Sequence, residues 1–373
     1  MKYSFVFLLA AYALAFTSCG NDWRPGTPLA KEKVKIGVVH ITNPFNETSG
    51  YSYAHQSGID EMRRNLSLND SQIIYRTNVD DVDQMHIEGR MREMIAQGAK
   101  IIIATSWGYM DTCEKLSAEF PSVIFANATG YKYNETNFTN YFGRLYQARY
   151  LSGIAAGLKT KTNMIGFVAA RGTDNSEVTG GLNAFAMGAH KVNPNVEVFV
   201  RVTHSWFDPM GEASAARALI ALGCDVIAQH CDTAVPQLEA QRAGVLGIGY
   251  NTDMKHDAPD AVLTSVIWHW GVYYTNLVRS VIDGTFKTDP WFGSLRDGII
   301  DLAPLNDRIE WDDDTSFVLN DMRRQLESET FNIYSGVIQT NDGRNIGLEN
   351  EIFSDSQIRN NINWYYKNIK LIR

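Results

Sequence analysis

The chain has 373 residues, which is enough for one large domain or two medium ones with a sizeable core. Hydrophobic residues make up 45% of it and charged residues 20%, the balance of an ordinary globular protein. The formal net charge of -8 argues against nucleic acid as the main partner.

The first residues have the pattern of a secretory signal. Residues 5–16 form an apolar run that follows a positive start and is too short for an ordinary membrane-spanning helix. Cys19 follows small residues, as the lipidated cysteine of a lipoprotein signal does, and the polar stretch after it suits a tether. We therefore expect a signal peptide over 1–18, a lipidated tether over 19–32, and a body held outside the cytoplasm on a membrane. An ordinary signal peptide with an incidental cysteine is the alternative.

The remaining cysteines are Cys113, Cys224 and Cys231, and their odd number excludes a complete disulfide framework. We expect each to be a small buried or half-buried thiol. Cys231 lies between His230 and Asp232, but adjacent residues rarely converge on one ion, and no partner pair at a suitable spacing follows. We expect neither a metal site nor a cofactor.

Short apolar runs rich in β-branched residues alternate with helical patterns along the chain. The predicted strands form a first series at 34–39, 72–75, 100–104 and 122–126, and a second at 164–168, 196–202, 226–228, 245–249 and 262–266. A long helix predicted over 146–159 separates the two series. This alternation predicts parallel, doubly wound sheets, and its restart predicts two α/β lobes.

The lobes are expected to exchange segments. One lobe would comprise 33–160 with 254–285, and the other 161–253 with 286–340. The last segment, 341–373, is expected to pack on the lobes. It opens with the turn signal Asn-Asp-Gly at 341–343 and ends in an amphipathic helix predicted over 354–369.

Polar and aromatic side chains follow many of the predicted strands directly. The first strand leads into a polar loop with Asn46 and then to Tyr51; later strands are followed by Ser106 and Trp107, by Trp206, by His230 and Asp232, by Asn251, and by Trp268. Ligands of open α/β sheets bind at the carboxyl ends of the strands, so these loops can face one crevice.

A crevice lined in this way suits a flat heteroaromatic ring or a sugar. Stacking on an aromatic face contributes on the order of 1 kcal/mol beyond area burial. An ionised Asp only accepts hydrogen bonds, whereas Asn donates and accepts, so the two can read the edge of a ring. Each tryptophan could instead pack under a helix: we expect that for Trp270 and Trp364, a ligand face for Trp206, and either role for Trp107.

Motifs that would indicate an enzyme are absent from the sequence. It has no G-x-S-x-G elbow, no Walker-type phosphate loop and no H-E-x-x-H. Residues 247–249, Gly-Ile-Gly, lack the later glycine of a dinucleotide fingerprint. We therefore predict no catalytic residues.

At the strand-end loops the chain resembles the basic membrane lipoprotein family. The matching runs are GYSYAH (50–55), TSWGYMD (105–111), ATGYK (128–132), YLSG (150–153), SWFDP (205–209), IAQHCD (227–232), GYNTDM (249–254), IWHWG (267–271), SGVI (335–338) and WY (364–365). These runs cover essentially the whole mature chain. Members of the family are substrate-binding lipoproteins of ABC importers, and several bind purines.

The resemblance implies a type I periplasmic-binding-protein fold, in which two α/β lobes joined by hinge strands close over the ligand. It implies that Tyr51 and Trp206 sandwich a purine, with polar contacts near Ser106, Asn127 and Asn251. Asn251 and Trp268 stand where the nucleoside-binding branch has Asp and Lys, which weakens the case for ribose recognition. The purine-base branch commonly has Asp at the Asn251 position and Trp at the Tyr51 position.

The leading hypothesis is a lipid-anchored receptor, expected to be a monomer, that captures a purine base or related nucleoside and delivers it to an ABC permease. A ligand sensor that docks a membrane signalling partner is the alternative. A nucleoside-processing enzyme is a third reading, disfavoured because no general acid or base is evident.

Overall fold

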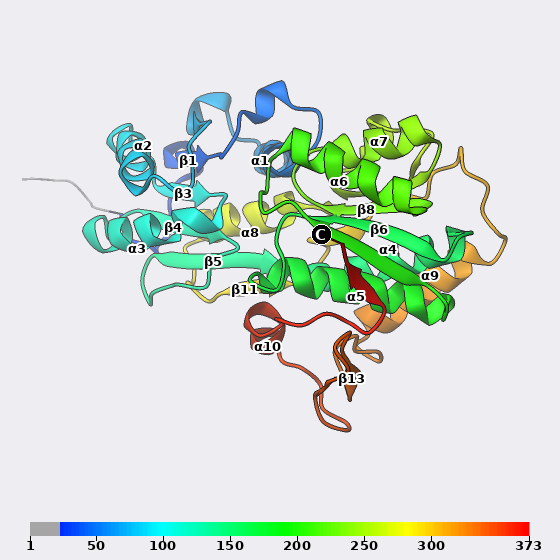
Figure 1. The fold of residues 1–373 in the computed structure, drawn as a ribbon. Helices are drawn as coiled ribbons and strands as arrows, with labels where there is room; N and C mark the ends of the chain where they lie inside the picture. The colour runs from blue at the N-terminus through cyan, green and yellow to red at the C-terminus, as the bar shows by residue number, and fades with distance from the viewer. Residues whose placement is uncertain (1–22, 373) are drawn as a thin grey trace, which may run out of the picture.

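The structure is a computed structural model that describes residues 23–372, and it divides them between two α/β lobes (Figure 1). The predicted signal peptide and Cys19 lie outside the described residues. Trp23 to Lys33 run along the first lobe, where the Leu29 N–H donates to the Val281 carbonyl at 3.2 Å. None of the helices in the described part of the chain is long and apolar enough to cross a membrane.

The first lobe is built on a wholly parallel sheet in the order β11-β5-β4-β3-β1-β2. Its strands are β1 (Ile36–Val39), β2 (Ile73–Arg76), β3 (Ile101–Ala104), β4 (Ile124–Ala128), β5 (Phe138–Gly143) and β11 (Trp291–Gly293). Its helices are α1 (Tyr51–Leu66), α2 (Gln84–Ala96), α3 (Met110–Glu119) and α8 (Trp270–Asp283). Every residue of β1 and β3 is buried, as expected for apolar strands covered by helices on both faces.

The second lobe is built on a sheet in the order β12-β10-β9-β8-β6-β7-β15, parallel except for β12. Its strands are β6 (Met164–Ala169), β7 (Glu197–Val202), β8 (Val226–His230), β9 (Leu246–Asn251), β10 (Val262–Trp268), β12 (Ile300–Leu302) and β15 (Ile369–Leu371). Its helices are α4 (Leu145–Lys159), α5 (Ser176–Val192), α6 (Pro209–Leu222), α7 (Val235–Ala243), α9 (Thr315–Glu327) and α10 (Asp355–Asn360).

Helices α4 and α5 lie side by side across one face of the second sheet (Figure 1). A Cβ at Gly153 would overlap the Phe185 carbonyl oxygen, and one at Gly188 would overlap that of Tyr150. The two glycines therefore let the helix backbones touch.

The chain crosses between the lobes three times: between β5 and α4, between β10 and α8, and between β11 and β12. At the middle crossing Trp268 stacks on Trp270 with ring centroids 4.4 Å apart. A Cβ at Gly143, on the first crossing, would lie 2.6 Å from the Trp268 ring. These contacts bring two of the crossings together into one hinge region.

This arrangement corrects the expected lobe boundaries. β10 lies within the 254–285 segment expected in the first lobe, but it pairs with β9 in the second sheet. β11 was expected in the second lobe and pairs with β5 in the first. α4 was expected in the first lobe and packs on α5 and β10. The three crossings between the lobes therefore lie before α4, after β10 and after β11. The packed residues of the hinge region fix the chain at these points.

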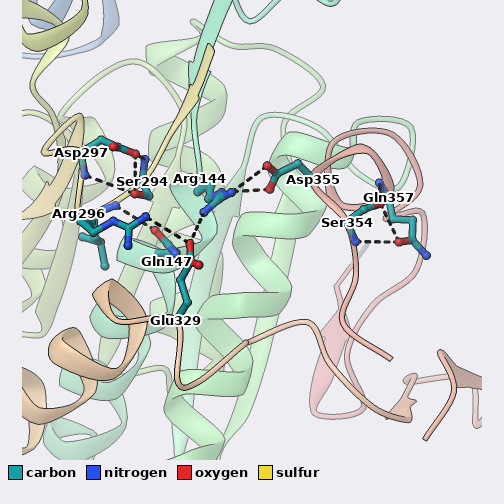
Figure 2. Close-up of polar contacts among 10 residues, drawn as sticks. Arg144, Gln147, Ser294, Arg296, Asp297, Glu329, Ser354, Asp355 and Gln357 are labelled. Carbon is teal, nitrogen blue, oxygen red and sulfur yellow. Dashed lines mark hydrogen bonds and ion pairs between the residues drawn. The ribbon is translucent and has the colours of Figure 1, made fainter. Parts of the chain in front are cut away.

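Arg144 ties this hinge region to the C-terminal part of the chain (Figure 2). Its Nε and Nη2 donate to the two carboxylate oxygens of Asp355 at 3.1 and 3.0 Å, and its Nη1 donates to Glu329 at 3.4 Å. Gln147, one turn along α4, accepts a hydrogen bond from the Leu295 N–H at 3.0 Å. The first and last crossings are thus linked to each other and to α10.

The C-terminal helix predicted over 354–369 is wrong. Only α10 is helical; the chain then runs extended and ends in β15, beside β7. Asn183 of α5 causes the difference, because its side chain donates to the Trp364 carbonyl and accepts from the Tyr366 N–H, both at 2.8 Å. The predicted turn is confirmed: β13 (Ile338–Gln339) and β14 (Asn345–Ile346) form a hairpin around Gly343.

Candidate ligand-binding site

A cavity of about 310 Å³ lies between the lobes at the carboxyl ends of the parallel strands. Its lining comes from both lobes and comprises Ile41, Tyr51, Asp81, Ser106, Trp107, Thr129, Arg171, Asp174, Asn175, Glu177, Trp206, His230, Asp232 and Tyr250. A second hollow of about 300 Å³ shares Tyr51, Trp206 and Asp232 with it.

Tyr51 is the first residue of α1 and forms part of the first-lobe wall. Its hydroxyl donates to the Thr105 carbonyl at 2.8 Å, and its ring meets that of His55 edge-on, with centroids 4.4 Å apart. Two contacts therefore fix the ring. Gly50 precedes it in a positive-φ conformation and lies directly against the Asp232 carbonyl of the other lobe.

Ser106 and Trp107 extend the same wall beyond β3. The Ser106 hydroxyl donates to Asp81 at 2.6 Å and accepts from the Gly108 N–H at 3.3 Å, so it caps the short 3₁₀ turn that follows. Trp107 is 58% exposed at the rim. Its ring is available to a ligand rather than packed under a helix.

Trp206 contributes the second-lobe wall. It lies in the loop between β7 and α6, and its carbonyl accepts from the Asp232 N–H at 2.9 Å. Asp208 caps α6 through the Gly211 N–H at 3.0 Å, which ends the loop two residues after Trp206. The Arg171 guanidinium lies 6.0 Å from the Trp206 ring centroid. The ring is half-buried and faces the cavity.

A buried arginine lies behind the lining. The Arg149 guanidinium stacks 4.2 Å from the centroid of the Tyr250 ring, and its Nη1 donates to the Gln229 carbonyl at 2.8 Å. Its Nε and Nη2 have no protein partner among the described residues. Burial lowers the pKa of Arg149 to about 10, which still leaves it charged at neutral pH.

Two carboxyl groups of the lining are held in unusual states. Burial raises the pKa of Glu177 to about 7, against the opposing effect of Arg149. Burial and the nearby Glu212 carboxylate raise the pKa of Asp232 well above its usual range. His230 lines the same cavity, and burial next to Arg149 lowers its pKa well below the usual value, so the ring is neutral.

The structure brings together six of the ten residues predicted to bind ligand. Tyr51, Ser106, Trp107, Trp206, His230 and Asp232 all line the cavity. The other four lie outside the lining: Asn46 is exposed on its loop, Asn127 is buried and donates to the Ser106 carbonyl at 2.6 Å, Asn251 is buried at the end of β9, and Trp268 packs in the hinge. Asn127 and Trp268 can act only through the residues that they position.

The part of the lining that follows β6 was not predicted from the sequence. Arg171, Asp174, Asn175 and Glu177 come from this single loop and the start of α5. The same signal, polar residues directly after a predicted strand, was present in residues 170–177. Two other predictions are confirmed: Trp270 and Trp364 are buried, and Cys113, Cys224 and Cys231 are free buried thiols. Within residues 23–372 no cluster of His, Cys, Asp or Glu could hold a metal ion.

Two α/β lobes with a ligand-sized cavity between them have the architecture of the periplasmic-binding proteins. Residues 34–343 match the family model of the PnrA-like ABC transporter substrate-binding proteins, and the chain belongs to this family. The basic membrane lipoprotein resemblance and the type I fold are therefore confirmed. Membership makes the protein a solute-binding component of an ABC importer, with a small-molecule ligand and a membrane permease as partner, and indicates an extracytoplasmic location.

Two curated relatives are similar along most of the chain. A purine-binding protein of Brucella abortus is 34% identical over 321 residues, which cover 85% of this chain and 88% of that protein. A Haloferax volcanii protein, named as a candidate ABC transporter glucose-binding protein, is 33% identical over 310 residues, covering 82% of this chain and 74% of that one.

Solved structures support the fold. A transcriptional activator of the comK gene from Bacillus halodurans superposes with a TM-score of 0.68 at 19% identity, over 80% of this chain and 99% of that one. An ABC solute-binding protein from Aeropyrum pernix superposes with a TM-score of 0.67 at 14% identity, over 80% and 92% of the two chains.

Proposed function

We propose that the protein captures a purine base, or a related nucleoside, between its lobes and delivers it to an ABC permease. The observation that carries the proposal is that Tyr51 and Trp206, one aromatic ring from each lobe, line the same cavity. A flat heterocycle between two rings gains stacking on both faces. The name of the Brucella relative, a purine-binding protein, supports the same ligand class.

The charge of the lining favours a ligand without phosphate. Asp81, Asp174, Glu177 and Asp232 contribute carboxyl groups, against the single guanidinium of Arg171 in the lining. A phosphate would meet more carboxyl groups than guanidinium groups in this lining, whereas the N–H groups of a neutral base can donate to the carboxyl oxygens. The proposal is therefore for bases and nucleosides and excludes nucleotides.

Calorimetric titration with adenine, guanine, hypoxanthine, xanthine and their nucleosides tests the assignment. We expect at least one base to bind with micromolar affinity or better and AMP to bind more weakly than adenosine. Absence of binding by every purine at high micromolar concentration would refute it. Glucose belongs in the same panel because of the name of the Haloferax relative, and tight glucose binding without purine binding would reassign the ligand to a sugar.

Transport, rather than signalling, is the proposed role of the closed complex. The same closed state could dock a signalling partner, and a neighbouring gene for a kinase instead of a permease and an ATPase would favour that alternative. We propose that the protein has no catalytic activity of its own. Release of a free base from a nucleoside incubated with pure protein would contradict this.

The predicted anchor and oligomeric state are part of the same proposal. Lipidation of Cys19 would hold the protein on the membrane, so a Cys19→Ser variant should move from the membrane fraction to the soluble fraction. A monomer suffices for the proposed role, because one chain supplies both walls of the cavity. Light scattering coupled to size exclusion measures the mass directly.

A further inference from the structure

Glu177 and His230 form a polar pair in the lining that the stacking argument does not use. The His230 Nε2 atom lies 3.4 Å from a Glu177 carboxylate oxygen. The His230 side chain is 1% exposed, and neither of its ring nitrogens makes a hydrogen bond within the described part of the chain. Both residues line the cavity, so a ligand there can reach the pair.

The fold fixes the position of Glu177. It is the second residue of α5, whose first turn is capped by the Asn175 side chain through the Val178 N–H at 3.0 Å. Its side chain is 23% exposed, and it also lines a smaller hollow that extends toward α10. The carboxylate is therefore held at the junction of two cavities instead of being free in solvent.

The two side chains offer complementary hydrogen-bonding groups. An ionised Glu177 can only accept, whereas a neutral imidazole offers one N–H donor and one acceptor. Adjacent acceptor and donor groups match the edge of a heterocycle that carries an N–H beside an unprotonated ring nitrogen. Purine bases present such edges.

We propose that Glu177 and His230 together read such an edge, and that capture of the ligand fixes Glu177 in its ionised form and releases a proton. This inference rests on the proposed function and deepens it, because it names the residues that recognise the edge of the base. On binding, the proton leaves the Glu177 carboxyl group for solvent, and the ligand N–H takes its place as hydrogen-bond donor.

The surroundings of Glu177 determine its proton occupancy in the empty site. Several charged and titratable groups interact electrostatically with Glu177. They are Arg149 of α4, Arg359 of α10, His230 and Asp232 at the end of β8, Tyr51 of α1 and Tyr250 of β9. Arg149 and Arg359 favour the ionised form, but burial outweighs them and raises the pKa of Glu177 to about 7. The group is therefore partly protonated near neutral pH.

Titration of adenine into the wild-type protein tests the proposal. With a free-state pKa of about 7, linkage predicts about tenfold weaker binding at pH 6 than at pH 8. Calorimetry at pH 6 in two buffers of different ionisation enthalpy should show release of close to one proton per adenine. Proton uptake, or no proton exchange, would overturn the proposal while leaving purine binding intact.

Two variants test whether Glu177 and His230 cause the pH dependence of adenine binding and recognise the base. Glu177→Gln keeps the shape and removes the titration, so its adenine affinity should vary less than twofold between pH 6 and pH 8. If adenine binding by this variant kept its full pH dependence, Asp232 would be the group that titrates, and the assignment of the titration to Glu177 would be overturned. His230→Gln should weaken adenine binding at both pH values, and unchanged affinity would remove His230 from the pair. Absence of adenine binding by the wild type at both pH values would overturn the proposed function and this inference with it.

Discussion

Adding a single methyl group at Gly50 should affect ligand affinity and folding stability through two separate causes. It is the N-cap of α1, with φ 97° and ψ -175°. This region of backbone space is essentially restricted to glycine, and another residue held there costs about 1–3 kcal/mol. A Cβ at this position would also overlap the carbonyl oxygen of Asp232, which belongs to the second lobe.

The two effects of Gly50→Ala act on different equilibria. Backbone strain lies within the first lobe and lowers the stability of the folded chain by about 1–3 kcal/mol whether or not ligand is bound. The overlap with Asp232 exists only when the lobes approach as closely as they do here. A penalty of about 1.4 kcal/mol on that state alone lowers apparent ligand affinity tenfold if binding requires it. We therefore expect at least a tenfold loss of affinity in addition to the loss of stability.

Calorimetric titration and urea-induced unfolding of the same preparations measure both effects. Gly89→Ala in α2 is the matched control, because no described heavy atom beyond the neighbouring backbone of its own helix lies within 4 Å of its added Cβ. That variant should keep wild-type affinity and gain up to about 1 kcal/mol of stability from helix propensity. Wild-type affinity in Gly50→Ala would show that the lobes do not need this approach to hold ligand, and would refute the reasoning.

Three further changes probe the walls, the closure and the ionisation of the site. Trp206→Ala should weaken purine binding by at least about 1 kcal/mol through lost stacking, measured by calorimetry. Arg359→Met removes a hydrogen bond of 2.8 Å from α10 to the Gly130 carbonyl of the first lobe, and it should favour the open form and weaken binding several-fold. Glu177→Gln should stabilise the ligand-free protein at pH 8 but hardly at pH 5. Because the pKa of Glu177 is about 7 when folded and near 4.5 when unfolded, its ionisation costs the folded state up to about 3 kcal/mol above pH 7 and nothing below pH 4.5.

Each of these changes has a matched comparison. Tyr133→Ala removes an aromatic side chain that is 57% exposed and lies outside the cavity lining, so an equal loss of affinity in both variants would mean that Trp206 is not a wall. Arg308→Met breaks an exposed ion pair with Asp260 that should contribute little, and X-ray scattering that finds the Arg359→Met variant no more open than this control would contradict the closure argument. A stability gain from Glu177→Gln that is the same at pH 5 and pH 8 would show that the carboxyl group is not held protonated.

Most strands and helices could be predicted because their apolar runs report burial directly. β3, with the sequence Ile-Ile-Ile-Ala, is fully buried and was recognised for that reason. β5 (Phe138–Gly143) is fully buried too, but it was missed because Thr139 and Asn140 interrupt its apolar pattern. α9 was missed for a similar reason, since only three of its residues are buried.

Contacts between distant segments determine the features that differ from the sequence-based predictions. The sequence of residues 361–368 does not indicate that this segment is extended, because its hydrogen bonds come from the distant Asn183 side chain. The placement of β10 and β11 depends on pairing with β9 and β5, which local pattern cannot distinguish. Six of the ten predicted site residues meet at one cavity although the lobe boundaries were misplaced, because residues at strand ends share one edge whichever lobe they belong to.

The division of the two aromatic walls between the lobes links recognition to closure in the proposed mechanism. Tyr51 moves with the first lobe and Trp206 with the second, so a flat ligand can stack on one ring in an open form but on both only when the lobes meet. The second stacking contact forms only in the closed state, so the ligand binds the closed state more tightly than the open one. Such a difference in affinity is the only way in which a ligand can shift the equilibrium between the open and closed forms. Gly50 and Arg359 lie outside the cavity lining, yet they bias the same equilibrium through contacts between the lobes. The Gly50→Ala variant should therefore lower purine affinity without changing the order of preference among bases, whereas Glu177→Gln should change that order.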